Sequence, residues 1–131
     1  MKKKVFIDQK PLHCPSQLRA IHDTMDILSG KWKITIIGCL AFGDKRFMDL
    51  MREVKGIGSK MLSKELRELE INGLISRTVQ PTKPVTVEYA LTAYGETLRP
   101  ILWEMANWGQ HHRVKVKATF NGEVSNSQNL A

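Results

Sequence analysis

The sequence has only two cysteines among its 131 residues, and no hydrophobic run long enough to cross a membrane. Cys14 and Cys39 match neither the spacing of a metal site nor the disulfide framework of a small secreted domain. The first residues are basic, but Asp8 follows and no apolar signal-peptide core is present. We therefore predict a cytoplasmic protein that needs no cofactor or metal and does not bind membranes.

Signatures of catalysis are absent as well. The four histidines form no cluster with carboxylates suited to acid–base chemistry, and there is no phosphate-binding loop or nucleophile motif. His111 and His112 could bind a metal, but two histidines near a helix end are more often simply exposed. We predict that the protein is not an enzyme.

Positive charge is in excess. The formal net charge is +7, of which residues 1–20 contribute +4 and the rest of the chain only +3. Nucleic acid is a plausible partner on this count, although bulk charge alone does not identify one. The length is that of a single domain, which can bury a core without disulfide or metal support.

Hydrophobic spacing predicts four helices in the first half of the chain. Residues 17–28 repeat apolar side chains at helical spacing, with Ser16 as the expected N-cap. Residues 32–42 are apolar on most faces, which is typical of a central core helix. Two amphipathic helices follow over residues 47–54 and 59–72, separated by a short glycine-containing turn.

The second half of the chain predicts a hairpin and a last helix. Residues 74–80 and 85–91 are rich in β-branched and aromatic side chains, and the prolines of the intervening PTKP suit a loop. Thr92 is expected to cap the last helix, in which Pro100 predicts a kink or a local break. The fold class is thus mainly α with a small β-hairpin, in the order of a winged helix-turn-helix.

Composition divides the chain into three parts. Residues 1–13 are expected to form an N-terminal arm and residues 14–113 the winged-helix domain. Residues 114–131 are rich in Asn and Ser and predict a flexible C-terminal tail. Alternation from Val114 to Phe120 leaves open a short strand that pairs in an oligomer.

The predicted helix over residues 59–72 sorts its charges by face. With Leu62 at the origin of a helical wheel, Leu66 and Leu69 lie within about 40° and form a buried stripe. Basic and hydroxyl side chains occupy the opposite face, between about 100° and 200°; they are Lys60, Ser63, Lys64 and Arg67. Lysine and arginine can donate to guanine in the major groove of DNA. A solvated face with ion pairs such as Lys64–Glu68 is the alternative.

Neighbouring residues could add further contacts to DNA. Ser59 can cap this helix, whose first turn then presents backbone N–H groups to a phosphate. Arg77 on the first strand and Lys83 at the hairpin tip are placed to contact phosphate or the minor groove. An ordinary exposed loop lysine is the alternative for Lys83.

As a set, these motifs resemble the HxlR-type bacterial transcriptional regulators, a MarR-like winged-helix family. The resemblance rests on CP at 14–15, GKWKITII at 30–37, KRFMDL at 45–50, GIGSKMLSKELRELEINGLISR at 56–77, VEYALTAYG at 87–95 and LRPILWEMANWG at 98–109. It implies a homodimer that binds double-stranded operator DNA, with residues 59–72 as the recognition helix. Repression is the commoner outcome when a dimer covers a promoter.

The resemblance also implies a set of contact residues. The candidates for DNA contact are Ser59, Lys60, Ser63, Lys64, Arg67, Arg77 and Lys83, with Lys31 and Arg46 adding backbone contacts. The family often has Arg or Lys soon after the position of Ser63, where this chain has Glu65. Operator preference therefore does not transfer from a relative.

The terminal helices are expected to form the dimer, because the last helix carries more apolar side chains than a four-helix core needs. The predicted interface residues are Leu18, Ile21, Leu98, Leu102, Met105 and Trp108. In the family these helices pack across a two-fold axis, which places two recognition helices about 34–36 Å apart and predicts an inverted-repeat operator. Closure of the monomer core is the alternative role for these residues.

The signal could act through a thiol. In several relatives a cysteine next to a proline near the N-terminus senses oxidants or electrophiles, and Cys14 has this position. His13, if protonated, could lower the pKa of that thiol. A structural thiol is the alternative, and Cys39 is expected in the core.

Two other hypotheses remain open. The effector could instead be a small molecule in a pocket lined by Trp32, Phe42 and Trp108. The protein could also be a winged-helix module that contacts another protein and does not bind DNA. A strong salt dependence of duplex binding would separate DNA binding from this last alternative.

Overall fold

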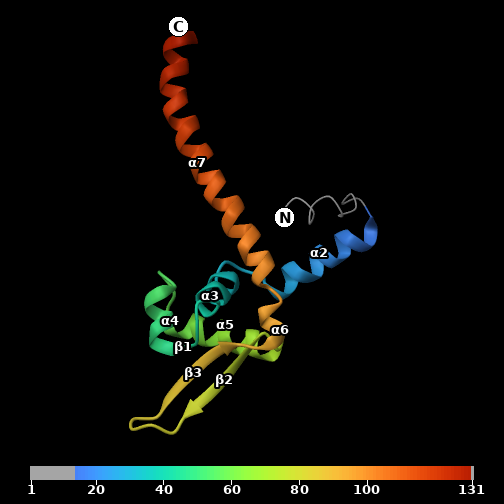
Figure 1. The fold of residues 1–131 in the computed structure, drawn as a ribbon, viewed down its shortest axis with the longest axis vertical. Helices are drawn as coiled ribbons and strands as arrows, with labels where there is room; N and C mark the ends of the chain where they lie inside the picture. The colour runs from blue at the N-terminus through green and yellow to red at the C-terminus, as the bar shows by residue number, and fades with distance from the viewer. Residues whose placement is uncertain (1–13, 131) are drawn as a thin grey trace.

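The computed structural model describes residues 14–130, with side chains described up to residue 122. Its elements are α2 (Pro15–Ile27), α3 (Lys33–Leu40), β1 (Lys45–Arg46), α4 (Phe47–Glu53), α5 (Ser59–Ile71), β2 (Ile75–Gln80), β3 (Thr86–Leu91), α6 (Ala93–Glu96) and α7 (Arg99–Leu130). Helices α3 to α5 and the sheet form a body from which α2 and α7 project (Figure 1). The arm predicted for residues 1–13 lies outside the described residues.

The predicted hairpin is confirmed, and a third strand joins it. Strands β2 and β3 are antiparallel, in a register that runs from Ile75 opposite Leu91 to Gln80 opposite Thr86. The short strand β1 pairs with the other edge of β3 and gives the order β1-β3-β2. A strand of two residues has no alternation to detect. For this reason the sequence pattern does not predict β1.

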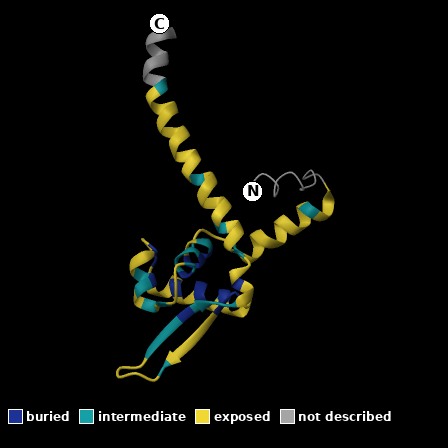
Figure 2. Cartoon of the chain, viewed as in Figure 1, coloured by how far each residue is buried: buried dark blue, intermediate teal, exposed yellow. Residues whose placement is uncertain are grey.

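The hydrophobic core lies between α3, α5 and the sheet. Its buried side chains are Ile36, Ile37, Leu40, Leu50, Val54, Ile57, Leu62, Leu66, Leu69, Leu74, Ile75 and Tyr89. Figure 2 shows the buried residues gathered on α3 and α5, while α2 and α7 are exposed along most of their length. The predictions of a central core helix at α3 and a buried leucine stripe on α5 are confirmed.

A buried lysine connects α3 to α5. Lys33, with 4% of its surface exposed, donates from Nζ to Glu65 Oε1 at 2.7 Å and to Glu68 Oε1 at 2.6 Å. Glu65 is also 4% exposed. Burial acts to lower the pKa of Lys33, but the hydrogen bonds to the two carboxylates outweigh it and raise that pKa. Lys33 therefore stays charged inside the fold.

Two of the predicted N-caps are wrong and one is confirmed. Helix α2 is capped by Cys14 and begins at Pro15, whose fixed φ and missing N–H suit a first helical position. Gly58 is the N-cap of α5, so Ser59, predicted to cap it, is instead the first residue of that helix. Thr92 caps α6, and its side-chain oxygen accepts a hydrogen bond from the N–H of Gly95 at 3.0 Å.

The break predicted at Pro100 is confirmed. Residues 97 and 98 separate α6 from α7, and Pro100 is the second residue of α7. A proline at this position offers no N–H to the carbonyl of Glu96, so a continuous helix would lose that bond. Immediately before the break, a Cβ on Gly95 would lie only 2.0 Å from the carbonyl oxygen of Leu74. The absence of a side chain at Gly95 thus allows α6 to pack directly against the turn between α5 and β2.

The tail differs from its prediction. Residues 114–130 continue α7, a single helix of 32 residues, so the short strand considered for residues 114–120 is wrong. A strand needs a neighbouring strand to bond, whereas a helix satisfies its own backbone groups. No interruption marks the boundary expected after residue 113. Within residues 14–130, no helix is both long and apolar enough to cross a membrane.

The buried ion pair generates a stability prediction. Lys33→Met keeps the apolar stem but leaves Glu65 buried without its cation, so the free energy of unfolding should fall by about 3–5 kcal/mol. The matched control is Arg52→Ala, which removes an exposed ion pair with Asp49 and should cost less than about 1 kcal/mol. Urea denaturation monitored by circular dichroism measures both values. Equal losses in the two variants would contradict the structural role of Lys33.

Candidate nucleic-acid interface

Helix α5 presents a polar face to solvent. Its leucines pack inward at Leu62, Leu66 and Leu69, and the face opposite them is exposed. All five side chains predicted to contact DNA from this helix are exposed, namely Ser59, Lys60, Ser63, Lys64 and Arg67. The first turn begins at Ser59, where backbone N–H groups without helical partners face outward. This geometry fits the entry of α5 into a groove.

The turn between α4 and α5 fixes how α5 is presented. Gly56 has φ of +90°, a conformation that other residues rarely adopt. A Cβ there would lie 3.6 Å from the indole of Trp32. Ile57, which follows, is buried in the core. The two helices are therefore held at a defined angle by a glycine turn closed over apolar side chains.

Lys64 does not stand free on the exposed face. Its Nζ lies 3.3 Å from Glu68 Oε2 and 4.0 Å from Glu65 Oε2. The intrahelical ion pair considered for Lys64 is thus present in the structure. Hydrogen bonds from Lys33 and then Lys64 lower the pKa of Glu68. Lys60 and Arg67 form no ion pair with any residue that the structure describes.

Glu65 does not lie on the exposed face of α5. It is turned toward α3, where its carboxylate accepts from Lys33. Glu65, the acidic residue that departs from the family pattern, therefore belongs to a buried ion pair. The sequence pattern could not predict this ion pair, because Lys33 lies 32 residues before Glu65. A lysine within an apolar segment is also normally expected to be exposed.

The other candidate contact residues lie at the surface on elements other than α5. Arg77 is exposed on β2 opposite Tyr89, and Lys83 is exposed in the loop of the hairpin. Arg46 is exposed and precedes α4, where its N–H donates to Asp49 Oδ2 at 3.0 Å. Lys31 Nζ lies 4.6 Å from the centre of the Trp32 ring, in a cation–π contact. Contact of these residues with DNA stays a prediction.

The predicted dimer residues fall into two groups. Leu98 and Leu102 are partly buried and pack against the core, which is the alternative role considered for the set. The other four are exposed on the projecting helices, at Leu18, Ile21, Met105 and Trp108. Trp108 is 68% exposed and stacks on His112 at a ring distance of 5.0 Å. Exposed apolar side chains in this number are typical of a surface that contacts another chain.

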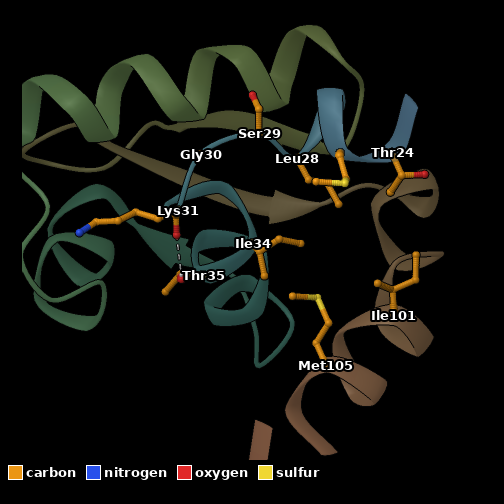
Figure 3. A pocket seen from close by; sticks show the side chains of 10 residues that line it. Thr24, Leu28, Ser29, Gly30, Lys31, Ile34, Thr35, Ile101 and Met105 are labelled. Atoms are coloured by element: carbon orange, nitrogen blue, oxygen red, sulfur yellow. Dashed lines mark hydrogen bonds between the residues drawn. The ribbon is translucent and has the colours of Figure 1, made fainter. Parts of the chain in front are cut away.

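The pocket predicted from Trp32, Phe42 and Trp108 is wrong. Phe42 is 91% exposed just beyond α3, and Trp108 lies on the projecting part of α7. A different open cavity of about 540 Å³ lies where α2, α3 and α7 meet. Its lining is mostly apolar and includes Met25, Leu28, Ile34, Ile101 and Met105 (Figure 3). Helical spacing identifies apolar faces but does not say which faces meet.

Cys14 lies exposed at the start of α2. Its Sγ is 3.0 Å from Ser16 Oγ. The pKa of the Cys14 thiol is lowered, first by the hydroxyl of Ser16 and then by the backbone N–H groups of Ser16 and Gln17. Cys39 is half-buried, and burial raises the pKa of its thiol. His13, considered as the activating group, lies outside the described residues.

Comparison with known proteins places this architecture in a family. A family model described as HxlR-like helix-turn-helix matches residues 27–117. The HTH-type transcriptional regulator YybR of Bacillus subtilis (strain 168) is 35% identical over 128 residues, which cover 97% of each protein. Such relatives are named as transcriptional regulators, which supports the prediction that the chain is not an enzyme.

Solved structures agree with the fold. The redox regulator HypR in its reduced form superposes with a TM-score of 0.70 at 37% identity, covering 76% of this chain and 98% of that one. The reduced form of the regulator YodB from B. subtilis gives a TM-score of 0.60 at 37% identity, covering 72% and 89%. The winged helix-turn-helix fold predicted from the sequence is thereby confirmed.

The environments of the two thiols predict different reactivities. Iodoacetamide should alkylate Cys14 faster than Cys39 at pH 7, because the thiolate is the reactive form and the pKa of Cys14 is the lower one. Ser16→Ala should move the midpoint of the Cys14 pH–rate profile upward, since the hydroxyl stabilises the thiolate. Mass spectrometry of labelled peptides measures both rates, with Cys14→Ser to identify the signal. A midpoint unchanged by Ser16→Ala would show that this hydrogen bond has no effect.

Proposed function

The chain belongs to the HxlR-like helix-turn-helix family, and from this premise we propose that it is a cytoplasmic, sequence-specific DNA-binding regulator that represses transcription. The observation that carries the proposal is the exposed face of α5, where Lys60, Ser63 and Arg67 lie opposite the buried leucines. No acidic side chain interrupts these three. An α-helix with such a face has the dimensions and donors for a major groove.

In the proposed complex, α5 reads bases and other elements hold the phosphates. Arg67 and Lys60 donate to guanine or phosphate, and Ser63 contacts either. Arg77 and Lys83 on the hairpin extend the contact to the neighbouring backbone, while Lys31 and Arg46 add phosphate contacts. Residues 14–113 supply this whole surface, and we assign the arm of residues 1–13 and the tail of residues 114–131 no direct role in it.

We also propose that the protein acts as a homodimer through α2 and α7. The exposed apolar residues of these helices, Leu18, Ile21, Met105 and Trp108, support this assembly. A two-fold axis between them would set two copies of α5 about 34–36 Å apart, one turn of DNA. The operator would then be an inverted repeat.

The proposed signal acts on Cys14, which lies at the end of the interface helix α2. An electrophile would alkylate its thiolate, and an oxidant would convert it to a sulfenic acid. Either change adds bulk and alters charge beside Ser16, and so alters how α2 packs in the dimer. The structural likeness to HypR, a redox regulator by its description, supports this signal. A small apolar molecule in the cavity between α2, α3 and α7 is the second candidate.

The DNA proposal predicts selective and salt-dependent binding. Fluorescence anisotropy should show tight binding to a duplex from the upstream region of the gene itself, and weak binding to a scrambled duplex. Affinity should fall steeply with salt, because the protein releases counterions from the phosphates. Arg67→Ala should weaken binding by about 1–3 kcal/mol, whereas Lys117→Ala on the remote part of α7 should not.

The other outcomes are equally informative. Equal, weak binding to both duplexes would exclude autoregulation and call for selection from random sequences. Absence of binding to every duplex would contradict the DNA proposal and favour a winged helix that contacts another protein.

The dimer proposal predicts a different effect for two tryptophans of α7. Trp108→Glu should convert the dimer to a monomer in sedimentation velocity, because it places a carboxylate in the apolar interface. Trp103→Glu is the matched control, since Trp103 is 63% exposed but lies on another face of the same helix. Dissociation by both changes, or by neither, would contradict an interface centred on Trp108.

A further inference from the structure

One carboxylate on α5, that of Glu68, contacts two lysines at the same time. Glu68 Oε1 accepts from the buried Lys33 at 2.6 Å, and Glu68 Oε2 lies 3.3 Å from the Nζ of Lys64. The side chain of Lys33 is 5% exposed, that of Glu68 40% and that of Lys64 59%. Glu68 therefore connects the interior of the protein to the edge of its basic face.

We propose that Glu68 sets the affinity of the protein for DNA by holding Lys64 in the free state, so that a phosphate must displace this carboxylate before Lys64 can bind. The proposal rests on the proposed DNA-binding function. It makes Glu68 a positioning residue, which touches no DNA itself and acts through Lys64.

The two partners of Glu68 differ in how easily they can leave. Lys33 is buried and also bound by Glu65 at 2.7 Å, so it has no route to solvent or to DNA. The hydrogen bond from Lys33 therefore fixes the position of the Glu68 carboxylate on α5. Lys64 has a flexible exposed stem, and only its ammonium group is engaged, by Glu68 at 3.3 Å and more distantly by Glu65 Oε2 at 4.0 Å. When DNA approaches, Lys64 is the partner that exchanges.

Lys64 differs in this respect from the other cations of the helix. Lys60 and Arg67 lie on the same exposed face and have no acidic partner in the part of the chain that the structure describes. Those two can meet a phosphate without breaking an ion pair. A contact from Lys64 instead replaces one charged partner by another, so its net gain is smaller.

The expected effect is modest, because exposed ion pairs are weak. Glu68→Gln should raise affinity for both the operator and the scrambled duplex by about two- to five-fold at low salt, the range that an exposed pair supports. The gain should shrink as salt rises. Lys33 keeps Glu65 as its partner in this variant, so the fold should persist.

Glu70→Gln is the matched control for charge. Glu70 is an exposed carboxylate of the same helix and forms no ion pair with a described residue. Its removal changes the net charge by the same amount without releasing Lys64. We expect a smaller gain in affinity from Glu70→Gln than from Glu68→Gln.

The decisive experiment is a double-mutant cycle on the full chain. Affinity is measured by anisotropy for the wild type, Glu68→Gln, Lys64→Ala and the double variant, after thermal denaturation has shown that each is folded. The proposal requires that the gain from Glu68→Gln falls, in the Lys64→Ala background, to no more than the gain from Glu70→Gln. A larger gain there, or no gain in the wild-type background, overturns it.

Two further outcomes are distinguished by the same measurements. A wild type that binds no duplex refutes the proposed function itself, before Glu68 is tested. If Glu68→Gln does not fold, Glu68→Ala replaces it in the same cycle, since it also removes the carboxylate that contacts Lys64. A gain from Glu68→Ala that falls to the Glu70→Gln value in the Lys64→Ala background supports the proposal, and any other result overturns it.

Discussion

The buried contact of Lys33 with Glu65 and Glu68 is the constraint on which the orientation of the exposed face of α5 depends. Taking these charges out of water is costly, and apolar residues of similar volume would hold α3 and α5 together at least as well. What the ion pair adds is a constraint on the rotation of α5 about its own axis. A leucine stripe tolerates a small rotation of α5, whereas a buried ammonium group must meet its carboxylates. The rotation that satisfies Lys33 also turns Lys60 and Arg67 outward.

The second constraint is the apolar surface of the projecting helices α2 and α7, which stays exposed in a single chain. Helix α2 has no buried residue, and α7 exposes Met105, Trp108 and further apolar side chains beyond them. Water contact with this much apolar surface is unfavourable, which supports the proposed dimer. Cys14 is the N-cap residue of α2. In the proposed dimer, the thiol would therefore lie at the start of an interface helix.

Much of this arrangement could be predicted from local pattern. The face of α5, the hairpin and the break before Pro100 follow from spacing and from proline chemistry, because each depends on neighbouring residues. The inward turn of Glu65 depends on a lysine 32 residues away, and β1 is too short to carry a pattern. The cavity joins residues of three separate helices. Such features arise when distant segments meet, which periodicity does not specify.

The junction between α6 and α7 is attached to the body of the protein on both sides of the break. On the α6 side, Thr92 Oγ1 donates to the carbonyl of Gly73 at 2.6 Å, and Gly95 lies against Leu74, so α6 is attached to the turn between α5 and β2. On the α7 side, Leu98 and Leu102 pack against the core, and the N–H of Leu98 donates to the carbonyl of Gly95 at 3.0 Å. A pivot of about 5° there would move the far end of α7, about 48 Å away at 1.5 Å per residue, by about 4 Å. The direction of the long helix is therefore set at a junction that adjoins the end of the α5 segment.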